Sequence, residues 1–124
     1  MTEKEMQEIY ARLLELTKQG RLTWRPDGEN EFTTSFSRSS VSISTGMSIP
    51  HSLSLLRIHN QEGVIVAVAA NDTDLIAESL SVFVFALDPS ELFNLVQESV
   101  YKYSETSQNI LHELRELATY RPAA

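Results

Sequence analysis

The chain has 124 residues, of which 42% are hydrophobic, and a formal net charge of −7. This size predicts a single domain over residues 1–124, and the acidic balance argues against binding to nucleic acids or to anionic membranes. Cysteine is missing from the sequence, which excludes disulfides, thiolate nucleophiles and Cys-ligated metal centres.

The N-terminal segment predicts an amphipathic helix over residues 2–19, since apolar side chains recur every three or four residues. Thr2 and Glu5 have the spacing of a capping box, and Gly20 stands where a left-handed residue would end the helix. The segment is charged throughout and lacks the apolar stretch of a signal peptide. No apolar run in the chain has the length of a membrane span. We therefore expect a soluble, cytoplasmic protein.

From Leu22 to about Ala70 the apolar pattern alternates, as in β-strands. Trp24 precedes the turn residues 26–28 (Pro-Asp-Gly), and residues 60–63 (Asn-Gln-Glu-Gly) predict a hairpin loop. The sequence therefore predicts an antiparallel β-meander of four to five strands. Residues 64–70 are apolar on both faces, which predicts a strand that is covered on both sides.

Hydroxyl side chains gather on one face of the predicted strands. They indicate either a solvated sheet face or an edge that pairs with a strand of another chain, and both interpretations stay open. The residues concerned are Thr33, Ser35, Ser37, Ser40, Ser42 and Ser44.

The second half of the chain begins with residues 71–87, which fit a helix or a strand; we expect a short helical turn and then a strand. Asp88, Pro89 and Glu91 have the positions of a helix start, with Asp88 as the cap. One long helix is predicted to about Ala118, with an expected weak point at residues 104–109, which are poor helix formers. Its apolar stripe comprises Phe93, Val96, Val100, Tyr103, Ser107, Ile110, Leu114 and Leu117.

The predicted fold is α+β: an N-terminal helix, the antiparallel meander, and the long C-terminal helix packed on one sheet face. One small sheet has difficulty covering both helices, so we expect some apolar surface to be buried between chains. Trp24 and Tyr10 are the candidate pocket or core plug. The candidate interaction surface comprises Phe93, Val96, Val100, Tyr103, Ile110 and Leu114.

Reactive and metal-binding side chains do not converge in the sequence. His51 and His59 lie about 27 Å apart if their strand is extended, and His112 is alone on the last helix. Asp72 and Asp74 fit a turn cap better than a calcium site. Gly-rich nucleotide loops and a G-x-S-x-G elbow are missing. We expect no enzyme activity, no cofactor and no metal.

Four short motifs occur in a characteristic order: residues 20–24 (GRLTW), 32–34 (FTT), 60–63 (NQEG) and 91–96 (ELFNLV). With these motifs the chain resembles a loosely defined group of small, largely uncharacterised bacterial and phage proteins. The resemblance spans most of the chain and implies an N-terminal helix, a β-meander and a long C-terminal helix. It implies no activity and no catalytic residues.

Three functional hypotheses follow. The first is a non-enzymatic protein–protein interaction module that binds a protein partner or itself, as a homodimer. The second is a dedicated chaperone or inhibitor of a basic or aggregation-prone client, like a secretion chaperone or an immunity-type partner. The third is a small-ligand binder with Trp24, Tyr10 and His59 in its pocket.

Overall fold

The structure is a computed structural model that describes residues 1–48, 51–76 and 82–119. It has the α+β composition predicted from the sequence. In chain order the elements are α1 (Glu3–Lys18), β1 (Arg25–Pro26), β2 (Glu31–Ser35), β3 (Ser40–Ser48), β4 (His51–His59), β5 (Ile65–Ala70), the 3-10 turn η1 (Thr73–Leu75), β6 (Phe83–Ala86), α2 (Ser90–Tyr101) and α3 (Tyr103–Thr119).

One six-stranded sheet contains the strands in sequence order. Strands β1 to β5 form the predicted antiparallel meander, and the loop at residues 60–63 is a hairpin in which Gly63 has a φ of +81°. β6 adds a sixth strand, parallel to β5. The helical turn and strand expected within residues 71–87 are η1 and β6, and residues 77–81 lie outside the described part.

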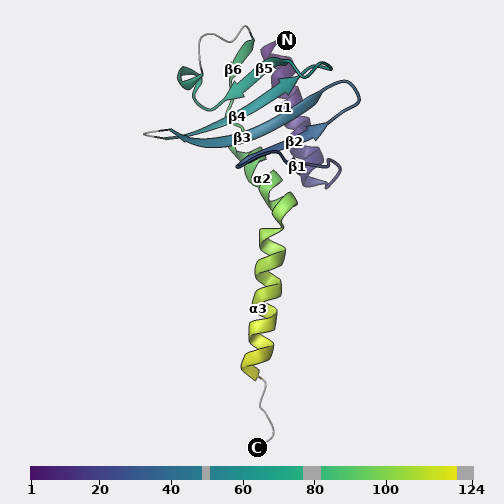
Figure 1. Ribbon diagram of the computed structural model, residues 1–124, viewed down its shortest axis with the longest axis vertical. Helices are drawn as coiled ribbons and strands as arrows, with labels where there is room; N and C mark the ends of the chain where they lie inside the picture. Colours follow the sequence, from purple (N-terminus) through teal and green to yellow (C-terminus); the bar gives the residue numbers. More distant parts are fainter. Residues whose placement is uncertain (49–50, 77–81, 120–124) are drawn as a thin grey trace, which may run out of the picture.

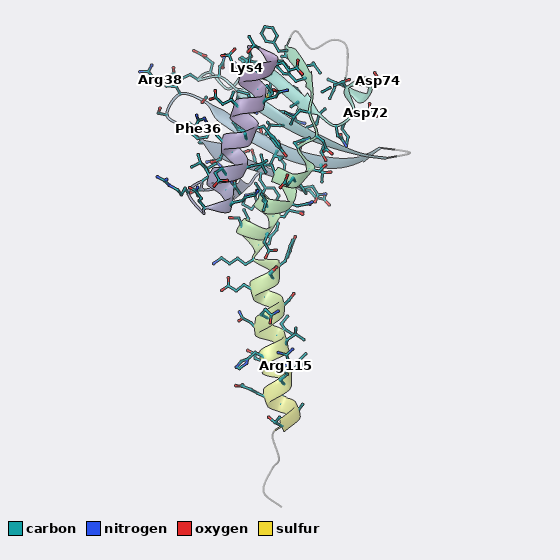
Figure 2. The ribbon with its side chains drawn as sticks, turned by 180° about the vertical axis from the view of Figure 1, so that it is seen from behind. Lys4, Phe36, Arg38, Asp72, Asp74 and Arg115 are labelled. Carbon is teal, nitrogen blue, oxygen red and sulfur yellow. The ribbon has the colours of Figure 1, made fainter. Side chains whose placement is uncertain are left out.

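Helices α1 and α2 cover the same face of the sheet, and Figure 2 shows both of them in front of the strands. Side chains from both helices and from the strands meet between the two layers, which removes their apolar surface from water. The rings of Phe32 and Phe93 contact each other edge-on, with centroids 5.8 Å apart. The buried cluster comprises Met6, Leu13, Trp24, Phe32, Val41, Ile43, Leu56, Ile58, Ala67, Ala69, Leu92, Phe93 and Val96.

Both ends of α1 are fixed by local residues. The Thr2 hydroxyl accepts from the Glu5 N–H at 3.1 Å, and the Glu5 carboxylate accepts from the Thr2 N–H at 2.9 Å, which is the predicted capping box. Gly20 has a φ of +69° at the other end. The N–H groups of Gly20 and of the next residue donate to the carbonyls of Thr17 and Leu16, so the last turn is closed as predicted.

Trp24 lies where the chain passes from α1 to the sheet. Its ring is buried, and its Nε1 donates to the Thr17 hydroxyl at 3.1 Å. The next two residues form β1, and Pro26 is accommodated because β1 is an edge strand. Gly28, with a φ of +93°, then allows the turn toward β2.

The predicted long C-terminal helix is divided into two helices. Lys102 adopts the left-handed conformation, with φ +52° and ψ +47°, ends α2, and is followed at once by α3. This break lies just before the weak segment at residues 104–109. As a result only α2 packs on the sheet, whereas α3 extends away from it (Figure 1). We call residues 1–101 the head and α3 the stalk.

The start of α2 differs from the prediction by one residue. Pro89, rather than Asp88, is the N-cap, and it can form no side-chain cap bond. The Asp88 carboxylate instead accepts from the N–H of Ser90 at 3.0 Å. Asp88 therefore still satisfies a free N–H group at the start of the helix.

Candidate functional site

The stalk is the part of the described chain that does not pack against the rest of the fold. It has 17 residues, and none of them is buried. Figure 2 shows no other element of the described chain beside it. Contiguous apolar surface of this kind usually marks an interaction site. The exposed fractions are 53% for Ile110, 41% for Leu111, 56% for Leu114 and 70% for Leu117.

Specific contacts hold the segment between head and stalk, residues 98–104, which we call the neck. The Glu98 carboxylate accepts from the N–H of Ser104 at 2.9 Å, which satisfies a free donor at the start of α3. The Tyr101 ring lies edge-on to Phe32 at 5.5 Å and 5.7 Å from the ring of Tyr103. These contacts anchor the stalk at its first turn only, so its apolar stripe is not folded back on the head.

The predicted interaction surface is divided between head and stalk. Phe93 and Val96 are core residues of the head, so the expectation that they face a partner is wrong: α2 packs them against the sheet. Val100 is half-buried at the margin of this core. The exposed members are Tyr103, Ile110 and Leu114, joined by Leu111 and Leu117, which the predicted surface omitted although Leu117 continues its spacing.

The sheet face opposite the helices carries a polar network. Arg57 of β4 forms an ion pair with Glu31 of β2 at 3.2 Å, reaching across β3. The Ser42 hydroxyl of β3 lies 2.7 Å from Nε2 of His59. Because β3 pairs with β2 on one side and with β4 on the other, it is not a sheet edge. The hydroxyl side chains of β3 therefore do not lie on an edge that could pair with another chain, and within the sheet Ser42 is buried while Ser40 and Ser44 are half-buried.

Ser42 and His59 have the contact of a nucleophile and a base, but their surroundings differ from those of a catalytic site. Ser42 is buried, and the backbone of β3 is paired on both sides, which leaves no free N–H pair for an oxyanion. Within the described chain, no carboxylate bonds the other ring nitrogen of His59. The pair therefore has the geometry of a cross-strand hydrogen bond.

An apolar cavity of about 290 Å³ opens beside α1. Phe36, in the loop after β2, is part of its wall, and Figure 2 shows this residue next to α1. No sequence pattern predicts this cavity, because its wall combines one face of α1 with the loop after β2 and with side chains of β3 and β4. Its lining comprises Ile9, Arg12, Leu13, Leu16, Phe36, Ser39, Val41 and Ile58.

None of the three predicted pocket residues, Trp24, Tyr10 and His59, lines this cavity. Trp24 is buried in the core of the head. Tyr10 lies against α2, where burial raises the pKa of its hydroxyl, although a backbone hydrogen bond with Leu92 acts in the opposite direction. Lys18 and Glu91 form an ion pair at 3.7 Å between the same two helices. Tyr10 and Trp24 thus contribute to packing within the head.

The remaining candidate ligand residues are far apart or locally bonded. His112 lies 3.0 Å from Glu116 on the stalk, and Asp72 accepts from the N–H of Asp74 at 3.1 Å in η1. Residues 1–48, 51–76 and 82–119 contain no cluster of three or more metal-binding side chains. In these ranges no helix has the length and apolarity needed to cross a membrane.

Comparison with known proteins gives no match: no family model, curated protein or solved structure is similar to this chain. Three features of the molecule bear on its function: the stalk, the polar sheet face and the cavity beside α1.

Proposed function

We propose that this protein is a non-enzymatic interaction module that docks on a protein surface through the apolar stripe of the stalk. The observation that supports the proposal is a complete amphipathic helix with no buried residue. An isolated helix of this length is marginally stable in water, and residues 104–109 are poor helix formers. A partner that covers the stripe adds the packing that the head does not provide.

The gain from docking is substantial. Full burial of a Leu or Ile side chain contributes about 1.5–3 kcal/mol, and the stalk carries four such side chains, three in the stripe and Leu111 beside it, that are 41–70% exposed. Part of this gain is offset by the entropy lost on association. Burial of the partner's own apolar surface adds to the gain, and the contact stabilises the helix that makes it.

A photoreactive amino acid in the stalk tests the proposal. It is introduced at Leu114, in the stripe, or at Gln108, outside it, in the full chain within its native cells. We expect covalent adducts from position 114 and none from position 108. An adduct with a basic client would indicate a dedicated chaperone or inhibitor, which the net charge of −7 favours. A stable chain that gives no adduct from position 114 contradicts the proposal.

The cavity beside α1 favours a second function, which is binding of a small apolar ligand such as an acyl chain. Its volume of about 290 Å³ is close to the lower limit of ligand pockets. Leu16→Phe narrows the cavity from the α1 side, so it is expected to abolish any rise in melting temperature caused by apolar ligands. If no apolar ligand raises the melting temperature of the unmodified chain, this second function is excluded.

A further inference from the structure

We infer that the stripe of the stalk is covered by the stalk of a second copy of this chain, in a parallel, in-register helix pair. The inference rests on the proposed function, because it requires the stripe to be a docking surface.

The apolar residues of the stalk have the spacing of a coiled-coil seam. Starting at Tyr103, steps of four, three, four and three residues lead along one stripe, which is the alternation of a and d positions in a heptad repeat. An identical helix presents the same repeat, so the knobs of one stalk fit the holes of the other. The seam residues are Tyr103, Ser107, Ile110, Leu114 and Leu117.

The head determines where this seam begins. The same repeat starts in α2 with Phe93, Val96 and Val100, but these side chains pack against the sheet and are not available to a second copy. The left-handed Lys102 then ends α2, so that the rest of the repeat leaves the head. The part of the heptad repeat that remains free is therefore the part carried by the stalk.

The charges next to the seam favour the parallel orientation. In a parallel pair a g position lies beside the following e position of the other helix. Glu113 then faces Ala118, and Thr106 faces Leu111, so no like charges meet. An antiparallel pair that aligns the same apolar residues places the two Glu113 carboxylates opposite each other, which is unfavourable.

The other charged side chains of the stalk occupy outward positions, so the seam itself is uncharged despite the net charge of the chain. A helix pair of this length buries less than the about 1,600 Å² of a standard interface. We therefore expect a weak dimer with a micromolar dissociation constant. The outward charged residues are Glu105, Arg115 and Glu116.

Light scattering of the purified full chain between about 1 and 100 µM tests the partner. We expect the mass to rise with concentration from 14.0 kDa toward twice that value. Leu114→Glu is expected to keep the chain monomeric, whereas Gln108→Glu adds the same charge outside the seam and leaves the dimer intact. A chain that is monomeric at the highest concentration, or a dimer that persists in Leu114→Glu, overturns the inference.

Disulfide cross-linking tests the orientation, since the chain has no cysteine of its own. Ser107→Cys places one thiol in the seam, and oxidised glutathione is expected to link two copies in the parallel pair. Gln108→Cys, one residue outside the seam, is the control and is expected to link much less. If linking requires a mixture of Ser107→Cys and Leu117→Cys chains, the pair is antiparallel and the parallel geometry is wrong.

The two proposals fail in different ways. A monomeric purified chain that still gives photo-adducts with another protein from position 114 overturns the second copy and keeps the interaction function. A monomeric chain without such adducts overturns both. A dimer that depends on Leu114 and gives adducts of twice the mass of the chain supports both.

Discussion

The head and the stalk carry the same heptad repeat with opposite burial. Val96 in α2 is completely buried, whereas Leu117, at the equivalent heptad position of α3, is 70% exposed. The two helices are separated by one left-handed residue, Lys102. Periodicity thus specifies which face of a helix will be covered, but not whether the same chain provides the cover. Four experiments test this difference between the head and the stalk.

The largest effect is expected in the head, from Trp24→Ala. It leaves a cavity where α1 meets the sheet and removes the hydrogen bond to Thr17, so the free energy of unfolding should fall by about 3–5 kcal/mol. Trp24→Phe is the control, because it keeps most of the packing and should cost clearly less. Urea denaturation measures both variants. An unchanged midpoint in Trp24→Ala would contradict the assignment of this ring to the core.

Truncation at equivalent heptad positions compares the two regions directly. Val96→Ala removes two buried methyl groups and should cost about 2 kcal/mol. Leu117→Ala removes more atoms from an exposed site and should change the free energy of unfolding by about 0.5 kcal/mol or less, in dilute solution where the chain is monomeric. Equal losses in the two variants would show that the stalk belongs to the cooperative unit of the head.

Glycine substitution examines the residue between the two regions. Lys102 has a positive φ, which is unfavourable for a residue with a Cβ, so Lys102→Gly should stabilise the chain by up to about 1 kcal/mol. Glu105→Gly, inside α3, should instead reduce helicity, since glycine costs about 1 kcal/mol in a helix. Circular dichroism and urea denaturation report the two changes. A loss of helicity in Lys102→Gly would mean that α2 and α3 are continuous in solution.

The smallest effect concerns the start of α1. Hydrogen bonds from the backbone N–H and the hydroxyl of Thr2 hold the pKa of Glu5 below its ordinary value. The associated stability is present above the ordinary pKa and is lost as the pH falls through the lowered value. The urea midpoint should therefore differ less between about pH 7 and about pH 3 in Glu5→Gln than in the unmodified chain. An identical pH dependence in both chains would show that this cap contributes nothing measurable.

The parts of the fold that could be predicted are those determined by neighbouring residues. The capping box at Thr2, the helix end at Gly20 and the hairpin at residues 60–63 depend on local chemistry, and the structure confirms each of them. The face of the C-terminal stripe was also predictable, because it follows from spacing alone.

The parts that could not be predicted depend on contacts across the fold. Lysine is a good helix former, so nothing in the sequence marks Lys102 as the left-handed residue that divides the helix. The ion pair of Arg57 with Glu31 requires the register of three strands, and the register of β4 against β5 shifts at Ile58 and His59. The break at Lys102, and not the composition of the stripe, therefore determines which half of the stripe is buried.

The position of Lys102 in the chain also separates the residues that build the core from those that carry the exposed stripe. Every helix and strand of the head precedes Lys102, and so does the ion pair of Lys18 with Glu91 that joins α1 to α2. The buried cluster contains no residue of the stalk. A partner can therefore cover the stripe of the stalk without opening the core of the head.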